Sequence, residues 1–263
     1  MAGVTVSVQL PPRISRSVLS DETYFVIRTM LLDHTISPGV RMNIDALSAE
    51  LGVSPTPVRE ALARLESDGL AVKTPLRGYF ATSLLTAKEF VELSQFRMLI
   101  EPWTAEQAAT VVDDAGIAAL RDELDRGRTA VLSEAGPEGE DAYTALTEHD
   151  ARFHALIAQL AGNELIVQSF ERTHFHLHFL RLYHASRTVS PRTADEAALI
   201  REAFSAYYRN GSGSRAIDEH TGIAEAIIDH RSSDAARLIG EHIESSRLRF
   251  EPVVALLHEL SGT

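Results

Sequence analysis

Four side chains in the C-terminal two thirds of the chain have the types and spacing of metal ligands. Asp150 and His154 are four residues apart in HDARFHALIAQLAGN, so a helix would present both on one face. His220 and His242 follow in two further segments of helical period. One carboxylate and three imidazoles from three helices would suit Zn²⁺ or another divalent cation. Each piece alone has a plainer explanation, because such an Asp/His pair is also a common surface hydrogen bond and a lone histidine is often structural or solvated.

A second group of histidines lies between residues 174 and 184. His174 and His178 are also four residues apart, whereas His176 would face away from both on a helix. The group, which ends at His184, could line an effector pocket or be a surface coincidence. We leave it out of the ligand set.

The segment NIDALSAELGVSPTPVREALARLESDGL predicts two short helices around a tight turn, which is the helix-turn-helix pattern. Asn43 can cap a helix over 44–51, and Gly52 suits a left-handed stop directly after it. Ser54 can cap the second helix. Two prolines fall in the first turn of that helix, where the backbone donors have no acceptor within the helix.

The outer face of this second helix has groups that bind DNA. If Val58 points inward, Thr56 and Arg59 lie on the opposite side and Arg64 lies on the flank. Arg59 can reach a guanine edge or a phosphate, while the hydroxyls of Ser54 and Thr56 suit phosphate oxygens. The alternative is a structural helical corner with solvated arginines.

The residues after Gly69 change to a strand-like period. AVKT and YFATS predict two short strands around a turn at Leu76-Arg77-Gly78, which is typical of a β-wing. Arg77 would lie at the tip of the wing. Arg77 and Gly78 could there follow the DNA backbone or the adjacent minor groove.

Composition and charge narrow the function classes. The chain has 263 residues, 44% hydrophobic, and no cysteine, which excludes a disulfide scaffold, a thiolate zinc finger and a cysteine nucleophile. The net charge of −12 belongs to the C-terminal part, because residues 1–84 have eight basic and eight acidic side chains and the remainder has 17 and 29. A neutral N-terminal part permits DNA contact. Without an apolar run of membrane length or a signal peptide, we expect a cytoplasmic protein.

From Thr86 onward the period is helical throughout. Helices are expected over about 86–111, 116–132, 141–161, 163–184, 193–209, 213–229 and 232–258, with loops near 133–140, 184–193 and 210–214. The expected fold is mainly α, with a small β-wing. A flexible arm at 1–17 would precede a winged helix-turn-helix domain at 18–84 and an all-helical bundle at 85–263 that binds ligand and dimerises.

The segment from Pro38 to Phe80, with the core LGVSPTPVREAL, resembles the winged helix-turn-helix of GntR-family bacterial transcription regulators. The resemblance covers about residues 20–82 and implies dimeric binding to a short palindromic operator. The family's DNA-contact positions correspond to Ser54, Thr56, Arg59 and Gly78. Pro55 and Asp45 stand where members of the family carry arginine, which suggests a different operator or a greater share of recognition by the wing.

Three later segments, FRMLIEPWTAEQAA, DARFHALIAQLAGN and EHTGIAEAIIDHRSSDAARLIGEHIESS, resemble the FCD effector domain of FadR-type GntR regulators over about residues 86–250. The resemblance implies a small organic acid bound beside a metal ion. Its metal ligands would be Asp150, His154, His220 and His242. Arg97, in an R-x-x-x-E pattern with Glu101, is the first choice for a carboxylate clamp and Arg181 the second. An intrahelical ion pair or a solvated arginine is the alternative for both.

Together these features predict a ligand-responsive transcriptional regulator, a repressor rather than an enzyme. It would be a homodimer that binds a palindromic double-stranded operator and senses a small carboxylate. The metal would be zinc, with nickel or manganese as alternatives. Two other functions stay open, a regulator whose only effector is the metal and a metal-dependent hydrolase, although the chain has no H-E-x-x-H motif.

Overall fold

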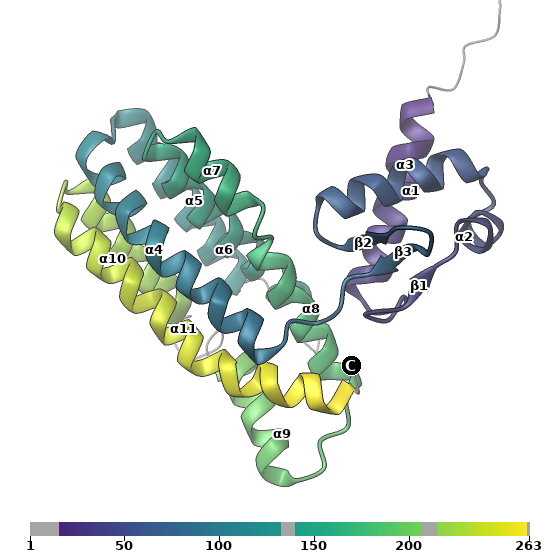
Figure 1. Cartoon of the computed structure of the whole chain (residues 1–263). Coiled ribbons are helices and arrows are strands. Elements are labelled where there is room, and N and C mark those ends of the chain that lie inside the picture. Colours follow the sequence, from purple (N-terminus) through teal and green to yellow (C-terminus); the bar gives the residue numbers. More distant parts are fainter. Residues whose placement is uncertain (1–15, 133–139, 207–214, 262–263) are drawn as a thin grey trace, which may run out of the picture. The chain divides into compact units, whose positions relative to one another are not determined.

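Figure 1 shows the computed structural model of the chain, which describes residues 16–132, 140–206 and 215–261. The chain forms two compact units, one ending at Thr82 and the other beginning at Ser83, while residues 32–34 belong to the second unit. Residues 1–15 of the predicted arm, residues 133–139 of the loop predicted near 133–140, and the loop predicted near 210–214 lie outside the described residues. Each unit has its own hydrophobic core.

The first unit combines helices with a small antiparallel sheet. Its elements are α1 (Arg16–Leu32), β1 (Arg41–Met42), α2 (Ile44–Leu51), α3 (Pro55–Ser67), β2 (Ala71–Thr74) and β3 (Gly78–Ala81). The strand order is β1-β3-β2, with Met42 opposite Tyr79 and Val72 opposite Phe80. Apolar side chains from helices and sheet form its core, among them Ile27, Val58, Leu62, Leu65 and Leu70. This is the winged helix-turn-helix that the sequence predicts.

Local sequence explains where the two helices of the motif begin and end. Asn43 Oδ1 accepts hydrogen bonds from the backbone of Asp45 (2.9 Å) and Ala46 (3.1 Å), which satisfies two free donors at the start of α2. Gly52 ends this helix with φ +65°, a conformation that favours glycine. Ser54 occupies the N-cap position of α3, as predicted, but its side chain makes no capping hydrogen bond.

The second unit is an antiparallel array of helices (Figure 1). Its elements are α4 (Ala87–Val111), α5 (Asp114–Leu132), α6 (Glu140–Leu160), α7 (Glu164–Glu171), α8 (Phe175–Thr188), α9 (Ala194–Arg201), a π-helical turn (Glu202–Ala206), α10 (Arg215–Ile228) and α11 (Ser232–Ser261). The most extensive pairing is that of α4 with α11, and α5 packs on α6. Buried Ala105, Ala108 and Ala109 of α4 share a core with Ile239 and Ile243 of α11. Small side chains on one helix thus let its partner approach closely.

The structure corrects two predicted boundaries and adds one strand that was not predicted. The helix predicted over 163–184 is two helices, because His174 takes a left-handed conformation (φ +47°) between α7 and α8. The loop predicted from His184 begins later, since α8 continues to Thr188. Strand β1 is missing from the sequence analysis because two residues carry no detectable period. No helix in the described part of the chain is long and apolar enough to cross a bilayer.

Candidate functional site

The structure brings the four predicted metal ligands together inside the helical unit. Asp150 and His154 come from α6, His220 from α10 and His242 from α11. One ligand atom from each of the four residues lies within 4.8 Å of the others. The three histidines are buried and Asp150 is partly exposed. The four-residue spacing on α6 places its two members on one face, and helix packing adds the other two.

Every histidine of this Asp/His cluster has its Nδ1 atom engaged by a neighbour. His154 Nδ1 lies 2.5 Å from Glu101 Oε2, and His242 Nδ1 lies 2.8 Å from Glu219 Oε2. His220 Nδ1 lies 3.0 Å from the Nε2 atom of a fourth imidazole, His149. A ring whose Nδ1 donates a proton keeps the lone pair of Nε2 for a metal ion. The tautomers that the neighbours favour are therefore those that ligation requires.

The residues present fit a divalent cation. The Nε2 atom of His220 is buried and has no hydrogen-bond partner among the described residues, while Asp150 Oδ1 lies 3.5 Å from it. Burial, together with the neighbouring imidazoles, lowers the pKa of His220 well below its usual range, and burial also lowers the pKa of His242. Both rings are therefore neutral near pH 7, and only a neutral imidazole can ligate a metal. Oxygen and nitrogen donors in this mixture suit zinc, nickel or manganese.

Sequence analysis missed the residues that hold the ligands. Glu101 is predicted only as a partner of Arg97, and no role is predicted for Glu123, His149 or Glu219. A signal existed in two places, because His149 directly precedes Asp150 and Glu219 directly precedes His220. Nothing in the sequence marks Glu123, which comes from a different helix and reaches the cluster only through packing.

The two predicted carboxylate clamps occupy different surroundings. Arg97 is buried beside the cluster, paired with both oxygens of Glu101 and stacked over the ring of Phe175 at 3.7 Å. Its Nη2 atom also lies 3.3 Å from Nδ1 of His154. Arg181 is buried on α8, where its Nη1 donates to the carbonyl of Ser83 at 3.2 Å. Arg97 thus adjoins the cluster, with its charge already balanced by a carboxylate.

The predicted DNA-reading side chains lie in the first unit, at the outer face of α3 and on the wing. Ser54, Thr56 and Arg59 are exposed at the start of α3. Arg77 is exposed at the turn between β2 and β3, its guanidinium 5.4 Å from the ring centre of Phe80, and the turn ends at Gly78 with φ +90°. These groups are therefore available to a duplex.

Arg64 differs from the other predicted DNA contacts. Its Nη1 lies 2.5 Å from Asp21 Oδ1, and its guanidinium covers the ring of Tyr24 at 4.1 Å. The hydroxyl of Tyr24 in turn donates to Asp68 at 2.6 Å. Arg64 therefore ties α1 to α3 within the first unit, and its reach toward a phosphate depends on leaving this contact.

Two family models match this chain, one over the winged helix-turn-helix unit and one over the helical unit. The family model described as bacterial regulatory proteins, gntR family, matches residues 19–80. The FCD domain model matches residues 92–245, more than half of the chain. The protein is a GntR-family regulator with an FCD domain. It is therefore a DNA-binding transcriptional regulator, a class of protein that is not enzymatic.

Curated relatives of this GntR/FCD regulator are transcriptional regulators too. The Nta operon transcriptional regulator of Aminobacter aminovorans is 31% identical over 152 residues, covering 58% of this chain and 68% of the relative. The HTH-type transcriptional repressor RspR of Escherichia coli is 28% identical, covering 64% and 69%. The Uxu operon regulator of Haemophilus influenzae is 26% identical over 235 residues, covering 83% and 79%.

Solved structures share the fold of the GntR/FCD regulator. E. coli McbR/YncC superposes with a TM-score of 0.58 at 17% identity, covering 92% of this chain and 97% of that one. A GntR transcriptional regulator from Rhodococcus sp. RHA1 gives a TM-score of 0.57 at 21% identity, covering 88% and 96%. The mainly α architecture with a winged helix-turn-helix is thus a known one.

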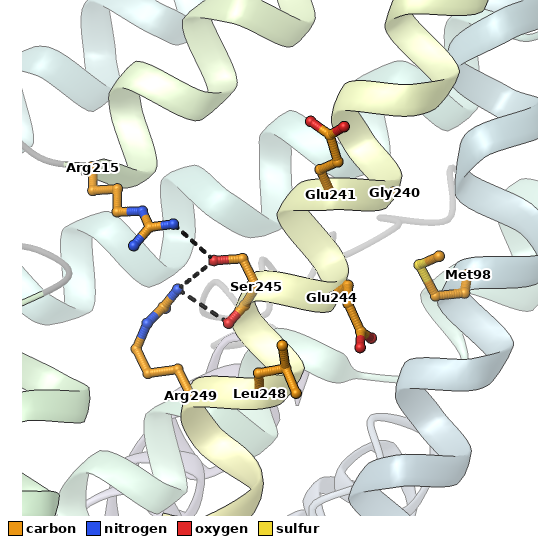
Figure 2. Close-up of a pocket in the computed structure, with 8 residues that line it drawn as sticks. All are labelled: Met98, Arg215, Gly240, Glu241, Glu244, Ser245, Leu248 and Arg249. Atoms are coloured by element: carbon orange, nitrogen blue, oxygen red, sulfur yellow. Dashed lines mark hydrogen bonds between the residues drawn. The ribbon is translucent and has the colours of Figure 1, made fainter.

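A surface groove of the GntR/FCD regulator shares α10 and α11 with the Asp/His cluster but contains none of the four predicted ligands. Figure 2 shows the groove between α4, α10 and α11, where Arg215 and Arg249 both donate to the hydroxyl of Ser245. Glu241 and Glu244 line its wall beside Met98 and Leu248. The groove is therefore mixed in charge, and it is separate from the Asp/His cluster.

Replacing Glu101 by glutamine in the GntR/FCD regulator is expected to destabilise the helical unit by ~3–5 kcal/mol, because Arg97 would stay buried without its counter-ion. Burial by itself would raise the pKa of Glu101, but Arg97 and His154 lower it to about 2. The carboxylate therefore stabilises the folded state above pH 4.5, and the wild type loses this contribution as the pH falls toward 2.

Urea unfolding of both proteins between pH 7 and pH 3 measures the effect. The difference between wild type and Glu101→Gln should shrink as the pH falls. Glu244→Gln is the matched control, since its ion pair with Arg247 is partly exposed and is worth at most ~1 kcal/mol. Equal losses in the two variants would contradict a role for the buried pair.

Proposed function

We propose that this GntR-family regulator senses a small carboxylate at a divalent metal centre formed by Asp150, His154, His220 and His242. The observation that carries the proposal is the convergence of these four side chains in a buried cluster with each histidine tautomer fixed by a neighbour. A bound cation supplies a Lewis-acid site for a carboxylate oxygen. We assign the cation as zinc, with nickel and manganese as the alternatives.

The DNA-binding role belongs to residues 18–84 and the sensing role to residues 85–263 in this proposal. Arg59 reads a base edge or phosphate, Ser54 and Thr56 hold phosphate, and the wing residues Arg77 and Gly78 follow the backbone. Arg64 contributes only when it leaves Asp21. The protein acts as a homodimeric repressor on a palindromic operator, and it works in the cytoplasm, where that DNA is found.

The helical unit controls DNA binding through a shift of population. Acid binding favours one spacing of the two winged helix-turn-helix domains in a dimer. An operator with half-sites about one helical turn apart fits one spacing better than the other. A coupling of ~1–3 kcal/mol would change operator affinity ~5–150-fold. Arg97 binds the carboxylate of the acid by exchanging its partner Glu101 for it, and Arg181 is the second choice for this role.

One observation favours a second candidate, a regulator that responds to the metal alone. Arg97 is already paired with Glu101, so a carboxylate effector must compete with a side chain that is held in place by burial. In this second case the Asp/His cluster holds only metal and water, and organic acids leave the operator affinity unchanged.

Fluorescence anisotropy with duplexes from the protein's own upstream region tests the proposal. Operator affinity is compared for protein freed of metal, for protein loaded with Zn²⁺, and for zinc-loaded protein with a panel of small mono- and dicarboxylates. At least one acid should change the affinity of the zinc-loaded form ~5–150-fold. His242→Ala should bind the same duplex and lose the response, while His230→Asn should keep it, because His230 is exposed and its left-handed conformation suits asparagine. A response to zinc with none to any acid would favour the second candidate.

A further inference from the structure

His149 is a buried imidazole next to the Asp/His cluster that is not one of its ligands. It lies on α6 directly before Asp150, with its side chain 1% exposed. Its Nε2 atom is 3.0 Å from Nδ1 of His220, and its Nδ1 atom is 2.9 Å from Oε1 of Glu123. The ring therefore bridges a carboxylate on α5 and a predicted ligand on α10.

Proton positions along this chain of contacts follow from ligation. A metal ion at Nε2 of His220 requires a lone pair there, so the proton of that ring is on Nδ1. Nδ1 must then donate to Nε2 of His149, which leaves the proton of His149 on Nδ1. That proton points at the carboxylate of Glu123. One tautomer of each ring satisfies every contact at once.

The carboxylate of Glu123 is the last acceptor in this series of contacts, and charged side chains hold it in place. Its side chain is only 6% exposed, yet both of its oxygens lie 3.1 Å from Nε of Arg152, and Arg126 lies at 3.5 Å. A carboxylate that is fixed by charged donors makes a stronger acceptor for a histidine N–H than a neutral group would.

Gly127 makes room for the His149 ring. It lies one turn after Glu123 on α5, and a Cβ atom there would be 2.7 Å from Cε1 and 2.8 Å from Nδ1 of His149. Cβ atoms do not approach other heavy atoms this closely, so any other residue would displace the imidazole. The same atom would be 2.7 Å from Ile217 on α10, three residues before His220.

We propose that Glu123, His149 and Gly127 form a positioning relay that aims Nε2 of His220 at the metal ion. The relay rests on the proposed metal centre. The other two ligand histidines each bond to a carboxylate directly, whereas His220 reaches its carboxylate through a second imidazole. Helix α5 contributes none of the four ligands and takes part in metal binding only through this relay.

Competition between the purified full-length protein and a zinc chelator tests the relay. His149→Phe and Glu123→Gln should each weaken Zn²⁺ binding ~10–100-fold, which is the usual effect of removing such a partner. Because both act on the same contact, the double variant should be little weaker than His149→Phe alone. His149→Gln, which can still accept from His220, should recover part of the loss. Gly127→Ala should also weaken binding by displacing the ring.

Nitrogen-15 NMR of labelled histidines reports the hydrogen bond at Nδ1 of His220 directly, which distinguishes loss of the relay from a simple loss of packing. In the zinc-loaded wild type, the Nδ1 proton of His220 should be held in a hydrogen bond, and its resonance should shift in His149→Phe. Asp125→Asn is the matched control, because Asp125 is on α5 between Glu123 and Gly127 and its side chain is 73% exposed. Operator binding of the metal-free variants checks that they fold.

Two results would count against the relay, and they are distinguishable. If the wild type binds no zinc, the proposed metal centre is wrong and the relay falls with it. If the wild type binds zinc while His149→Phe and Glu123→Gln bind it equally tightly with an unchanged His220 resonance, the centre stands and the relay alone is wrong.

Discussion

Replacing His220 by alanine is expected to weaken zinc binding more than about 100-fold, because it removes a proposed ligand that is fully buried and whose Nε2 atom has no hydrogen-bond partner among the described residues. Metal analysis of wild-type protein after dialysis should find about one zinc per chain, and the variant should retain none. Zinc should also raise the thermal midpoint of the wild type only, since a ligand at 100 times its Kd stabilises the folded state by about 2.7 kcal/mol.

His230→Asn is the control for this experiment, because it removes an imidazole outside the cluster and should leave the zinc content unchanged. Operator binding of metal-free His220→Ala shows that the variant folds. Equal zinc content in wild type and His220→Ala would contradict the assignment of the four ligands.

Replacing Arg59 by alanine is expected to weaken operator binding by ~1–3 kcal/mol, a factor of ~5–150, and to leave zinc binding as it is. Arg59 is exposed on α3 and directly follows the buried Val58, which anchors this helix to its core. Its loss therefore removes a contact with DNA without opening a cavity in the protein. Anisotropy at two salt concentrations measures the effect, because a phosphate contact lowers the salt dependence and a base contact lowers the discrimination between sequences.

Arg121→Ala removes the same charge from an exposed position on α5 in the helical unit and serves as the control. It should bind the operator like the wild type. If Arg59→Ala also bound the operator with unchanged affinity, α3 would not be the helix that reads DNA.

The first unit could be predicted closely because the residues that begin and end its helices and strands act through local contacts. Asn43 and Gly52 begin and end α2 through contacts within five residues, and the alternation around Arg77 marks the wing. Ser54 is predicted to cap α3 through its hydroxyl, but its side chain makes no capping hydrogen bond and proline occupies the first turn of that helix. Side-chain capping is one of several ways to satisfy a helix start, and a sequence does not tell which is used.

The helical unit shows where sequence reasoning ends. The pair Asp150 and His154 follows from a single helix, whereas His220 and His242 are lone histidines far along the chain that only the resemblance joins to this pair. Three carboxylates set the tautomers of the ligand histidines. Glu101 on α4 contacts His154, and Glu219 on α10 contacts His242. Glu123 on α5 acts on His220 through His149. Their roles depend on how helices pack across each other, which no local pattern encodes.

Arg97 illustrates a choice that the sequence left open. Its R-x-x-x-E spacing with Glu101 allowed either a clamp or an intrahelical ion pair, and the structure forms the ion pair in a buried site. The ion pair still adjoins His154, so Arg97 lies beside the Asp/His cluster whether it pairs with Glu101 or clamps an effector carboxylate. An effector acid would then act by exchanging one carboxylate partner of the arginine for another.

Coupling between the metal centre and the operator is the central claim, and thermodynamic linkage gives its most direct test. The affinity of Zn²⁺ is measured by chelator competition for the free protein and for the protein saturated with its operator duplex. If the centre controls DNA binding, the two zinc affinities should differ, by the same ~5–150-fold factor that zinc produces in operator affinity. For a system that also needs an acid, the same pair of titrations is made with the acid present. Identical zinc affinities in the free and operator-bound protein under both conditions would contradict the account.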